Sequence, residues 1–186
     1  MKANAIKAIL TSAAATAVCA AAWAESPPPP GDLVINGQTE IVTEANAPAY
    51  IDGLDKIYDG WRFRADETRA VETDDFDNPG MIFVDKARDV WNAVDGSEGK
   101  SCASCHNTPE ESMKGVRATY PKWDESMGKV ATIENEVNNC RTNRMGAEAW
   151  GYTSDTMTAM NALITLQSRG MPVNVAVDGK AKDTWE

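Results

Sequence analysis

The chain has 186 residues, of which 42% are hydrophobic and 25% are charged, a balance that excludes wholesale disorder and allows one modest packed domain with appendages. Its formal net charge of −10 argues against a nucleic-acid-binding protein, because phosphates require a basic surface. Such acidity suits a basic partner protein, or simply keeps a protein dispersed in solution.

Residues 1–24 have the pattern of an export signal. Lys2 and Lys7 supply the positive start, and an alanine-rich apolar stretch follows from Ala8 to Ala22. Ala22-Trp23-Ala24 then matches the small-residue cleavage site that precedes a mature N-terminus. The apolar run is too short for a membrane span. We therefore expect cleavage after Ala24 and a periplasmic product with no membrane anchor.

Residues 25–80 are interpreted as an N-terminal extension. It begins with the stiff proline tether Pro27 to Pro30. Leu33-Val34-Ile35 and Glu40-Ile41-Val42 flank Asn36-Gly37, a pair that favours a type I′ turn, so a short β-hairpin is expected there. Residues 44–80 are polar and rich in turn formers, with room for short helical pieces only.

Residues 81–170 carry three helical stripes. The first spans 81–94 and is expected to end at Gly96, and the second runs through Ile133, Val137, Cys140 and Arg144. The third has Ser154 as its N-cap and is stopped by Gly170. Its core-facing side chains are expected to be Met157, Met160, Leu163, Ile164 and Gln167.

The pattern with the clearest chemistry is Cys102-Ala103-Ser104-Cys105-His106, because C-x-x-C-H is the attachment motif of c-type haem. Two thiols at this spacing each bond one haem vinyl group, and the following imidazole becomes an axial iron ligand. The motif follows the first predicted helix and the third lies downstream, an order that resembles the cytochrome c fold, in which the N- and C-terminal helices pack together beside the haem. A mainly α, cytochrome c-like haem domain is therefore predicted.

Other uses of this motif remain open at the level of sequence. A thioredoxin-like redox pair would need a β/α alternation that the chain lacks. A zinc site of Cys102, Cys105, His106 and Cys140 would require two adjacent residues to reach one small ion. A simple disulfide is a further alternative, although the three cysteines outside the signal segment cannot all pair within one chain.

The sixth iron ligand is a separate question. His106 is the only histidine, which excludes bis-histidine ligation within this chain. A methionine, a cysteine, a weaker donor, water or a vacancy all remain. Cys140 is a candidate because Arg141 and Arg144 lie nearby in sequence, and a cation favours the thiolate form that binds metals. A buried, inert thiol is the competing interpretation.

Several segments together resemble the SoxA family of sulfur-oxidation cytochromes. They are Asp75-Phe76-Asp77-Asn78-Pro79-Gly80-Met81, the C-x-x-C-H motif with Ser101, Glu111-Ser112-Met113-Lys114-Gly115, Gln167-Ser168-Arg169-Gly170-Met171, Thr68-Arg69 and Asn139-Cys140. The resemblance covers about residues 32–186. It implies a haem c subunit that pairs with a smaller SoxX-like cytochrome. That complex joins thiosulfate oxidatively to a cysteine of the carrier protein SoxYZ, releasing two electrons.

The resemblance also implies site residues. Cys102 and Cys105 would hold one covalent haem c, His106 would be the proximal iron ligand and Cys140 the distal thiolate ligand. The family's second C-x-x-C-H and its catalytic cysteine do not occur in this sequence. Residues 171–186 are accordingly interpreted as a linker towards a missing second haem domain, and enzymatic activity of this chain alone stays open. A stand-alone periplasmic monohaem electron carrier is the alternative function.

Overall fold

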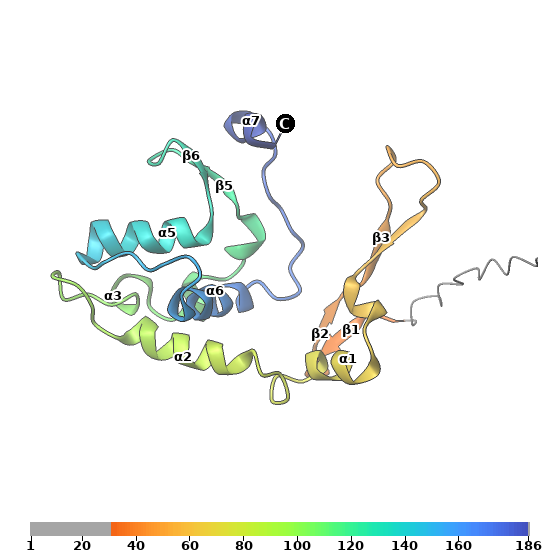
Figure 1. The fold of residues 1–186 in the computed structure, drawn as a ribbon, viewed down its shortest axis with the longest axis horizontal. Coiled ribbons are helices and arrows are strands. Elements are labelled where there is room, and N and C mark those ends of the chain that lie inside the picture. Colours follow the sequence, from red (N-terminus) through yellow and green to blue (C-terminus); the bar gives the residue numbers. More distant parts are fainter. Residues whose placement is uncertain (1–30, 186) are drawn as a thin grey trace, which may run out of the picture.

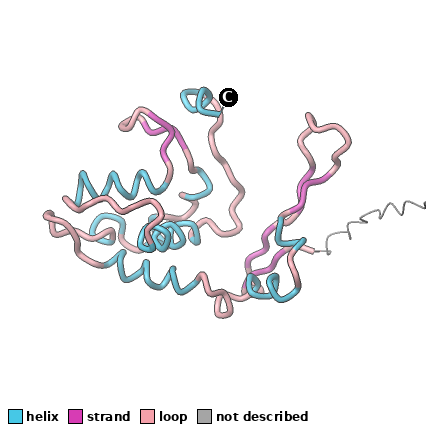
Figure 2. The backbone as a smooth tube through the Cα atoms, in the orientation of Figure 1, coloured by secondary structure: helices cyan, strands magenta, loops and turns pink. Residues whose placement is uncertain are grey.

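A computed structural model describes residues 31–185 of the chain (Figure 1). The predicted export signal, its cleavage after Ala24 and the tether Pro27 to Pro30 lie outside the described residues. Helices dominate the described part and strands occur only as short antiparallel pairs, so the expected mainly α architecture is confirmed (Figure 2).

The predicted N-terminal hairpin is present. Strand β1 (Leu33–Ile35) pairs antiparallel with β2 (Thr39–Ile41). Asn36 and Gly37 have positive φ values of 53° and 64°, as both central residues of a type I′ turn require. The amide of Gln38 closes this turn by donating to the carbonyl of Ile35 at 3.0 Å.

A second hairpin follows where the sequence indicated only turns and helical pieces. Strands β3 (Glu44–Asn46) and β4 (Lys56–Tyr58) pair antiparallel, and both are largely exposed. Because neither strand buries one face, the sequence lacks the alternation that reveals a strand. The short helices η1 (Gly60–Phe63) and α1 (Asp66–Thr73) then follow, and α1 packs on β1.

The helical part is built on the contact between two helices. Helix α2 (Met81–Asn92) packs against α6 (Asp155–Leu166), and this is the most extensive contact between elements in the described chain. The Ser154 side chain accepts a hydrogen bond from the amide of Met157 at 3.2 Å, which confirms the predicted N-cap. The core between them contains Val84, Ala87, Trp91, Tyr120, Ile133, Ala159, Met160, Leu163 and Ile164.

Shorter elements complete the helical part. In chain order they are α3 (Ala103–His106), α4 (Pro109–Ser112), η2 (Arg117–Thr119), the hairpin β5 (Lys122–Asp124) and β6 (Lys129–Ala131), α5 (Ile133–Cys140) and the π-helical turn η3 (Arg141–Met145). After α6 the chain runs without regular structure to η4 (Gly179–Ala181) and α7 (Lys182–Trp185), beside β5 (Figure 1).

Two predicted helix ends are wrong by a few residues. Helix α2 ends at Asn92 rather than at Gly96, because Ala93 already leaves helical geometry with ψ of 131°. Helix α6 ends at Leu166, and a further turn separates it from Gly170. Both glycines do adopt positive φ, so they shape the loops that follow and do not cap the helices.

The hairpins and the helical part meet at a bidentate ion pair. Both terminal nitrogens of the Arg169 guanidinium donate to the Asp75 carboxylate at 2.8 Å. The Asn36 amide also donates to Asp75 at 2.9 Å, which brings the β1–β2 turn into the same contact. One side-chain network therefore joins the first hairpin, the approach to α2 and the segment after α6.

Candidate haem site

The C-x-x-C-H motif forms a single helical turn. The amide of His106 donates to the carbonyl of Cys102 at 3.0 Å, which places both residues on the same side of α3. Ser101 and Ser104 brace the turn through their hydroxyl groups, 3.0 Å apart, and each also accepts a hydrogen bond from the other's amide. The local sequence thus presents two thiols and one imidazole from one short segment.

The imidazole of His106 lies beside a buried indole. The ring centroids of Trp91 and His106 are 5.9 Å apart, with the planes at 49°. The indole Nε1 of Trp91 donates to the carbonyl of Asn107 at 2.8 Å. Helix α2 therefore fixes the residue that follows the motif, and through it the position of the imidazole.

The third candidate thiol comes from the end of a separate helix. Cys140 is the last residue of α5, whose start is held by a reciprocal cap. The Asn135 amide donates to the Thr132 hydroxyl at 3.4 Å, and the Thr132 amide donates to the Asn135 side chain at 3.0 Å. The π-helical turn η3 follows directly, so Cys140 stands where the helix changes its pitch.

One cavity of about 640 Å³ collects the four candidate ligand-bearing residues, a volume within the range of cofactor pockets. Cys102, Cys105, His106 and Cys140 all line it. Its apolar walls come from α2, α5, η3, α6 and the segment between α4 and β5, and they comprise Trp91, Met113, Val116, Tyr120, Ile133, Val137, Met145, Met160 and Ile164. Asp124, Ser126, Glu136 and Asn139 contribute polar groups, and Arg141 and Arg144 contribute cationic residues.

Burial controls the acidity of two of the thiols. It raises the pKa of Cys102 and that of Cys140 above the usual range of a thiol. Arg144 and Arg141 lower the pKa of Cys140, as the sequence suggested, but burial outweighs them. A bound metal reverses this balance, because a coordinating thiol loses its proton outright.

A polar edge of the cavity is formed by Tyr120, Asp124 and Glu136. Burial, followed by the nearby Glu136 charge, raises the pKa of Tyr120 to about 12. Burial and then Asp124 raise the pKa of Glu136. One carboxyl oxygen of Glu136 is buried and without a hydrogen-bond partner among the described residues. The cavity therefore has one wall that disfavours further negative charge.

The donor set fits haem c better than it fits a single small ion. Cys102, Cys105 and Cys140 are free thiols, which leaves both motif cysteines available for thioether bonds. Among residues 31–185, no three histidine, cysteine or acidic side chains converge closely enough to hold one metal ion. The candidate groups instead surround a largely apolar space, as a flat, mostly apolar cofactor requires.

Sequence patterns identified the reactive groups of this cavity but missed much of its wall. Met113, Val116 and Tyr120 lie in short, irregular segments without periodicity, so no helical stripe pointed to them. Met160 and Ile164 were expected as core residues, and they are buried as predicted while also facing the cavity.

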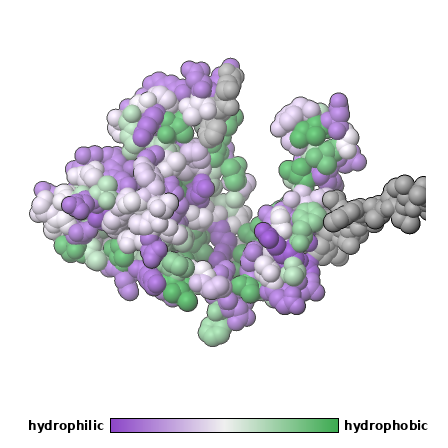
Figure 3. All heavy atoms as spheres, in the orientation of Figure 1, coloured by the Kyte–Doolittle hydropathy of each residue, from purple (hydrophilic) through white to green (hydrophobic). Residues whose placement is uncertain are grey.

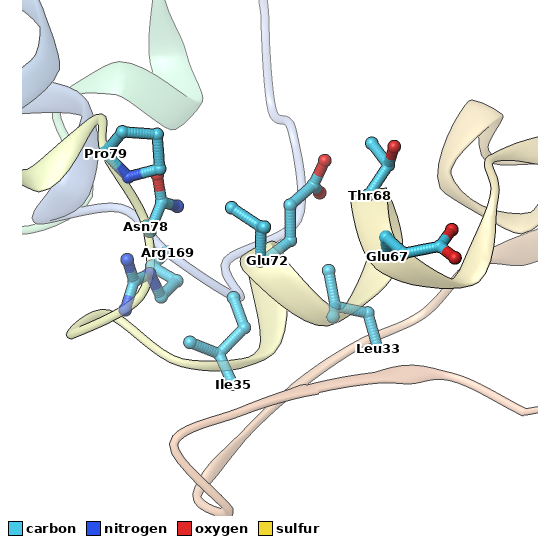
Figure 4. Close-up of a pocket in the computed structure, with 9 residues that line it drawn as sticks. Leu33, Ile35, Glu67, Thr68, Glu72, Asn78, Pro79 and Arg169 are labelled. Carbon is cyan, nitrogen blue, oxygen red and sulfur yellow. The ribbon is translucent and has the colours of Figure 1, made fainter.

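A second hollow, of about 610 Å³, lies beside the first hairpin. It is open, and its walls come from β1, α1 and the segment before α2, with Arg169 at one end (Figure 4). Its lining residues are Leu33, Ile35, Glu67, Thr68, Val71, Glu72, Asn78, Pro79 and Arg169. None of these is a thiol or an imidazole, so this hollow lacks the groups that bind haem covalently.

Comparison with known proteins identifies consistent relatives. The family model described as SoxA/TsdA, cytochrome c domain, matches residues 86–173. The L-cysteine S-thiosulfotransferase subunit SoxA of Rhodovulum sulfidophilum is 54% identical over 177 residues, which are 93% of this chain and 62% of that protein. The SoxA subunit of Paracoccus pantotrophus is 52% identical over 182 residues, with 96% and 62% covered.

A solved structure agrees with these matches. The crystal structure of SoxXA from P. pantotrophus superposes with a TM-score of 0.78 and 54% identity, covering 85% of this chain and 61% of that one. The chain thus spans about 62% of the length of these two SoxA relatives. Within the described residues, no helix combines the length and apolar character needed to cross a bilayer. The cytochrome c-like fold expected from the sequence is confirmed, and the site lies within the matched region.

Proposed function

Because the chain belongs to the SoxA family of cytochromes and carries covalently bound haem c, we propose that it serves as a haem subunit of a thiosulfate-oxidising complex. In this proposal a SoxX-like cytochrome is its stable partner, and a SoxYZ-like carrier protein visits the complex transiently. The carrier receives thiosulfate on a cysteine, and c-type haems remove the electrons. The single observation that carries the proposal is the convergence of three thiols and one imidazole on one apolar cavity.

We assign the haem contacts residue by residue. Cys102 and Cys105 would form the two thioether bonds, His106 would be the proximal iron ligand and Cys140 the distal thiolate ligand. None of these three cysteines is in a disulfide, and all three line the same cavity as His106, which supports this assignment. So does the origin of the axial pair, since the imidazole comes from α3 and the thiol from the end of α5.

The protein's own residues would control the environment of the iron. Haem c supplies a centre that exchanges one electron. The indole of Trp91 fixes the backbone beside the imidazole, and the apolar walls would limit the access of water to a bound haem. A thiolate ligand donates charge and stabilises the ferric state, so it lowers the reduction potential. A low potential suits a structural or tuning role better than direct acceptance of electrons from thiosulfate.

We also infer that the protein acts in the periplasm, after export and cleavage behind Ala24. The signal pattern of residues 1–24 supports this location, and c-type haem attachment agrees with it.

Mass spectrometry of the purified holoprotein tests the cofactor assignment. We expect haem to stay attached after denaturation, and the variant C102S/C105S to lose it completely. The variant S126A, which alters another cavity residue, should retain covalent haem. Full covalent attachment in C102S/C105S would reject the two thioether positions.

The distal ligand needs a separate measurement. In C140A we expect covalent haem at the wild-type level, a changed low-spin spectrum and a higher reduction potential, because the thiolate donor is gone. An unchanged spectrum and potential would remove Cys140 as a ligand while leaving the covalent site intact.

Reconstitution tests the place in the complex. We expect the chain to co-purify with a SoxX-like cytochrome. Thiosulfate-dependent modification of the carrier cysteine should then be measured with and without the remaining region of a full-length SoxA relative. A chain that exchanges electrons with acceptors but binds no SoxX-like partner would instead favour the stand-alone carrier.

A further inference from the structure

We propose that Arg141 is a positioning residue that fixes Cys140 opposite His106. It would do so by joining the turn after Cys140 to the loop that leads into the C-x-x-C-H motif. This inference deepens the proposed haem site and rests on Cys140 being the distal ligand.

The Arg141 side chain is buried and fully engaged. It is 4% exposed, its Nη2 donates to the Asp95 carboxylate at 2.7 Å, and its Nε donates to the carbonyl of Glu148 at 2.9 Å. The guanidinium carbon lies 3.8 Å from the centroid of the Trp150 ring. A buried cation requires such partners on every side, because an unpaired charge would be strongly destabilising. The position of Arg141 is therefore narrowly defined.

The backbone around Arg141 is unusual. Residues Arg141–Met145 form a π-helical turn directly after Cys140, and Gly146 ends it with a left-handed φ of 64°. The amide of Ala147 donates back to the carbonyl of Arg141 at 3.0 Å, which closes the turn on that residue. Short π-helical turns are rare and are frequent at functional sites. Here the turn follows the candidate ligand, so the contacts of Arg141 hold the end of α5.

The partner of Arg141 belongs to the other side of the haem site. Asp95 lies in the loop between α2 and the motif, and its amide donates to the carbonyl of Lys100 at 2.9 Å. A hydrogen bond from Arg141 is also the main reason why the pKa of Asp95 is lowered, so this carboxylate stays charged. The Arg141–Asp95 pair thus connects the segment after one axial ligand with the segment before the other.

Further contacts run in parallel with this ion pair. The amide of Glu98 donates to the carbonyl of Met145 at 3.0 Å, and the amide of Ser97 donates to the carbonyl of Gly146 at 3.2 Å. The ammonium of Lys100 donates to the carbonyl of Arg144 at 3.2 Å. Two loops far apart in the sequence are therefore bonded along their length, with Arg141 as the buried side chain at their junction.

An arginine is required at this position for a geometric reason. The planar guanidinium donates in two directions within one plane while its face stacks on an aromatic ring. A lysine would keep the charge but supply one compact donor group, so it could not serve Asp95, Glu148 and Trp150 together. The prediction is that charge alone will not replace Arg141.

The test compares R141K and R141Q with the wild-type holoprotein, and R88Q is the matched control. Arg88 of α2 is also an arginine paired with a carboxylate, that of Glu110, but it does not line the cavity, so R88Q removes an equal charge and an ion pair away from Cys140. Electron paramagnetic resonance and the reduction potential report the axial ligands, and mass spectrometry reports the covalent haem. We expect R141K and R141Q to keep haem but lose the single thiolate-ligated signal, with a higher potential, whereas R88Q keeps that signal.

The outcomes separate this inference from the proposed function. A single wild-type-like signal and potential in R141K and R141Q would overturn the positioning role while leaving the ligand assignment intact. If C140A has the same spectrum as the wild type, both the positioning role of Arg141 and the assignment of Cys140 as a ligand are overturned. If the Arg141 variants do not fold, D95A decides, because Asp95 is half-exposed and its removal frees only one nitrogen of Arg141. We expect D95A to give mixed ligation, and uniform thiolate ligation in D95A would reject the coupling between the two loops.

Discussion

The helical part, residues 81–170, and the hairpin part, residues 31–80, differ in what lies at their centres. Helices α2 and α6 enclose side chains such as Ala87 and Leu163 that are 0% exposed. The hairpin part buries Leu33 and Ile35, and next to them the polar Thr43 and Arg62. It leaves many large apolar side chains exposed, including Val34, Val42, Tyr50, Ile51, Leu54, Ile57, Tyr58, Phe63, Val71 and Phe76, and Figure 3 shows apolar green surface on the projecting hairpin.

This difference shows which part can hold a site by itself. The helical part has a continuous apolar core, and the candidate haem cavity opens from that core. The hairpin part relies more on directed polar contacts, because the Arg62 guanidinium donates to the Thr43 hydroxyl at 2.6 Å and pairs with Glu44 at 3.2 Å. The hairpins should therefore loosen before the haem site does.

The largest expected effect lies in the helical core. Replacing Leu163 with alanine leaves a cavity between α2 and α6, so we expect a loss of about 3 kcal/mol in the free energy of unfolding, within the usual range for buried leucine. Denaturant unfolding followed by circular dichroism measures it. The control T165A changes an exposed residue of the same helix and should cost less than about 0.5 kcal/mol. Equal losses in the two variants would contradict the contrast between core and surface.

A smaller effect is expected in the first hairpin. Ile35 is 8% exposed, and I35A should cost about 2 kcal/mol, the low end for such a change, because few buried apolar residues surround it. Hydrogen exchange should show faster opening of β1 and β2, with the haem spectrum unchanged. V42A, at a side chain that is 70% exposed beside the same hairpin, is the control and should leave exchange as it is. A shifted haem spectrum in I35A would show that the two parts are more tightly coupled than proposed.

The smallest effect concerns the ion pair between the parts. D75N removes the charge that binds Arg169, and we expect a loss of about 1 kcal/mol, the upper end for a partly exposed pair, because the contact is bidentate. D77N, a change at an exposed neighbouring carboxylate, is the control. Limited proteolysis between the hairpins and α2 should be faster in D75N than in D77N. Identical cleavage rates would reject the joining role of Asp75.

The same pair predicts a pH dependence. Hydrogen bonds from Arg169 hold the pKa of Asp75 below its ordinary value of 3.8. A carboxyl with a lowered pKa in the folded protein stabilises the fold above the unfolded value, and this contribution is lost as the pH falls through the folded value. Hairpin protection in the wild type should therefore decrease below about pH 4. In D75N this part of the pH dependence should disappear, which hydrogen exchange at a series of pH values can measure.

Local signals in the sequence predicted the regular elements well where a cap or a turn pair marked them. Ser154 and Asn36-Gly37 do what their residue types favour. The turn after Cys140 was not predicted. The predicted helical stripe continues without a break to Arg144, whereas the backbone changes from α- to π-helical after Cys140. Arg141, the first residue of that turn, pairs with Asp95, 46 positions away along the chain, and no local pattern records such a contact.

The candidate site shows the same division. The spacing of Cys102, Cys105 and His106 specifies one helical turn, and the structure places them as that turn requires. Cys140 was singled out as a spare thiol, and the structure brings it to the same cavity, while its role as a ligand stays a prediction. The part of the cavity wall formed by Met113 and Tyr120 could not be predicted, because both residues lie in irregular backbone.

The close contact between the two loops has a genetic consequence. Gly96 has a φ of 75°, and a Cβ added there would lie 2.2 Å from the carbonyl oxygen of Met145. A Cβ on Gly146 would lie 2.1 Å from the Ser97 hydroxyl. Every missense change that one nucleotide can produce in a glycine codon introduces a Cβ. A Cβ at Gly96 meets backbone atoms of Met145, Gly146 and Ala147 and would force the loops apart, so no side-chain change in the opposite loop compensates for it. At Gly146 rotation of the Ser97 hydroxyl relieves the contact, and what opposes a substitution there is the left-handed φ of 64°.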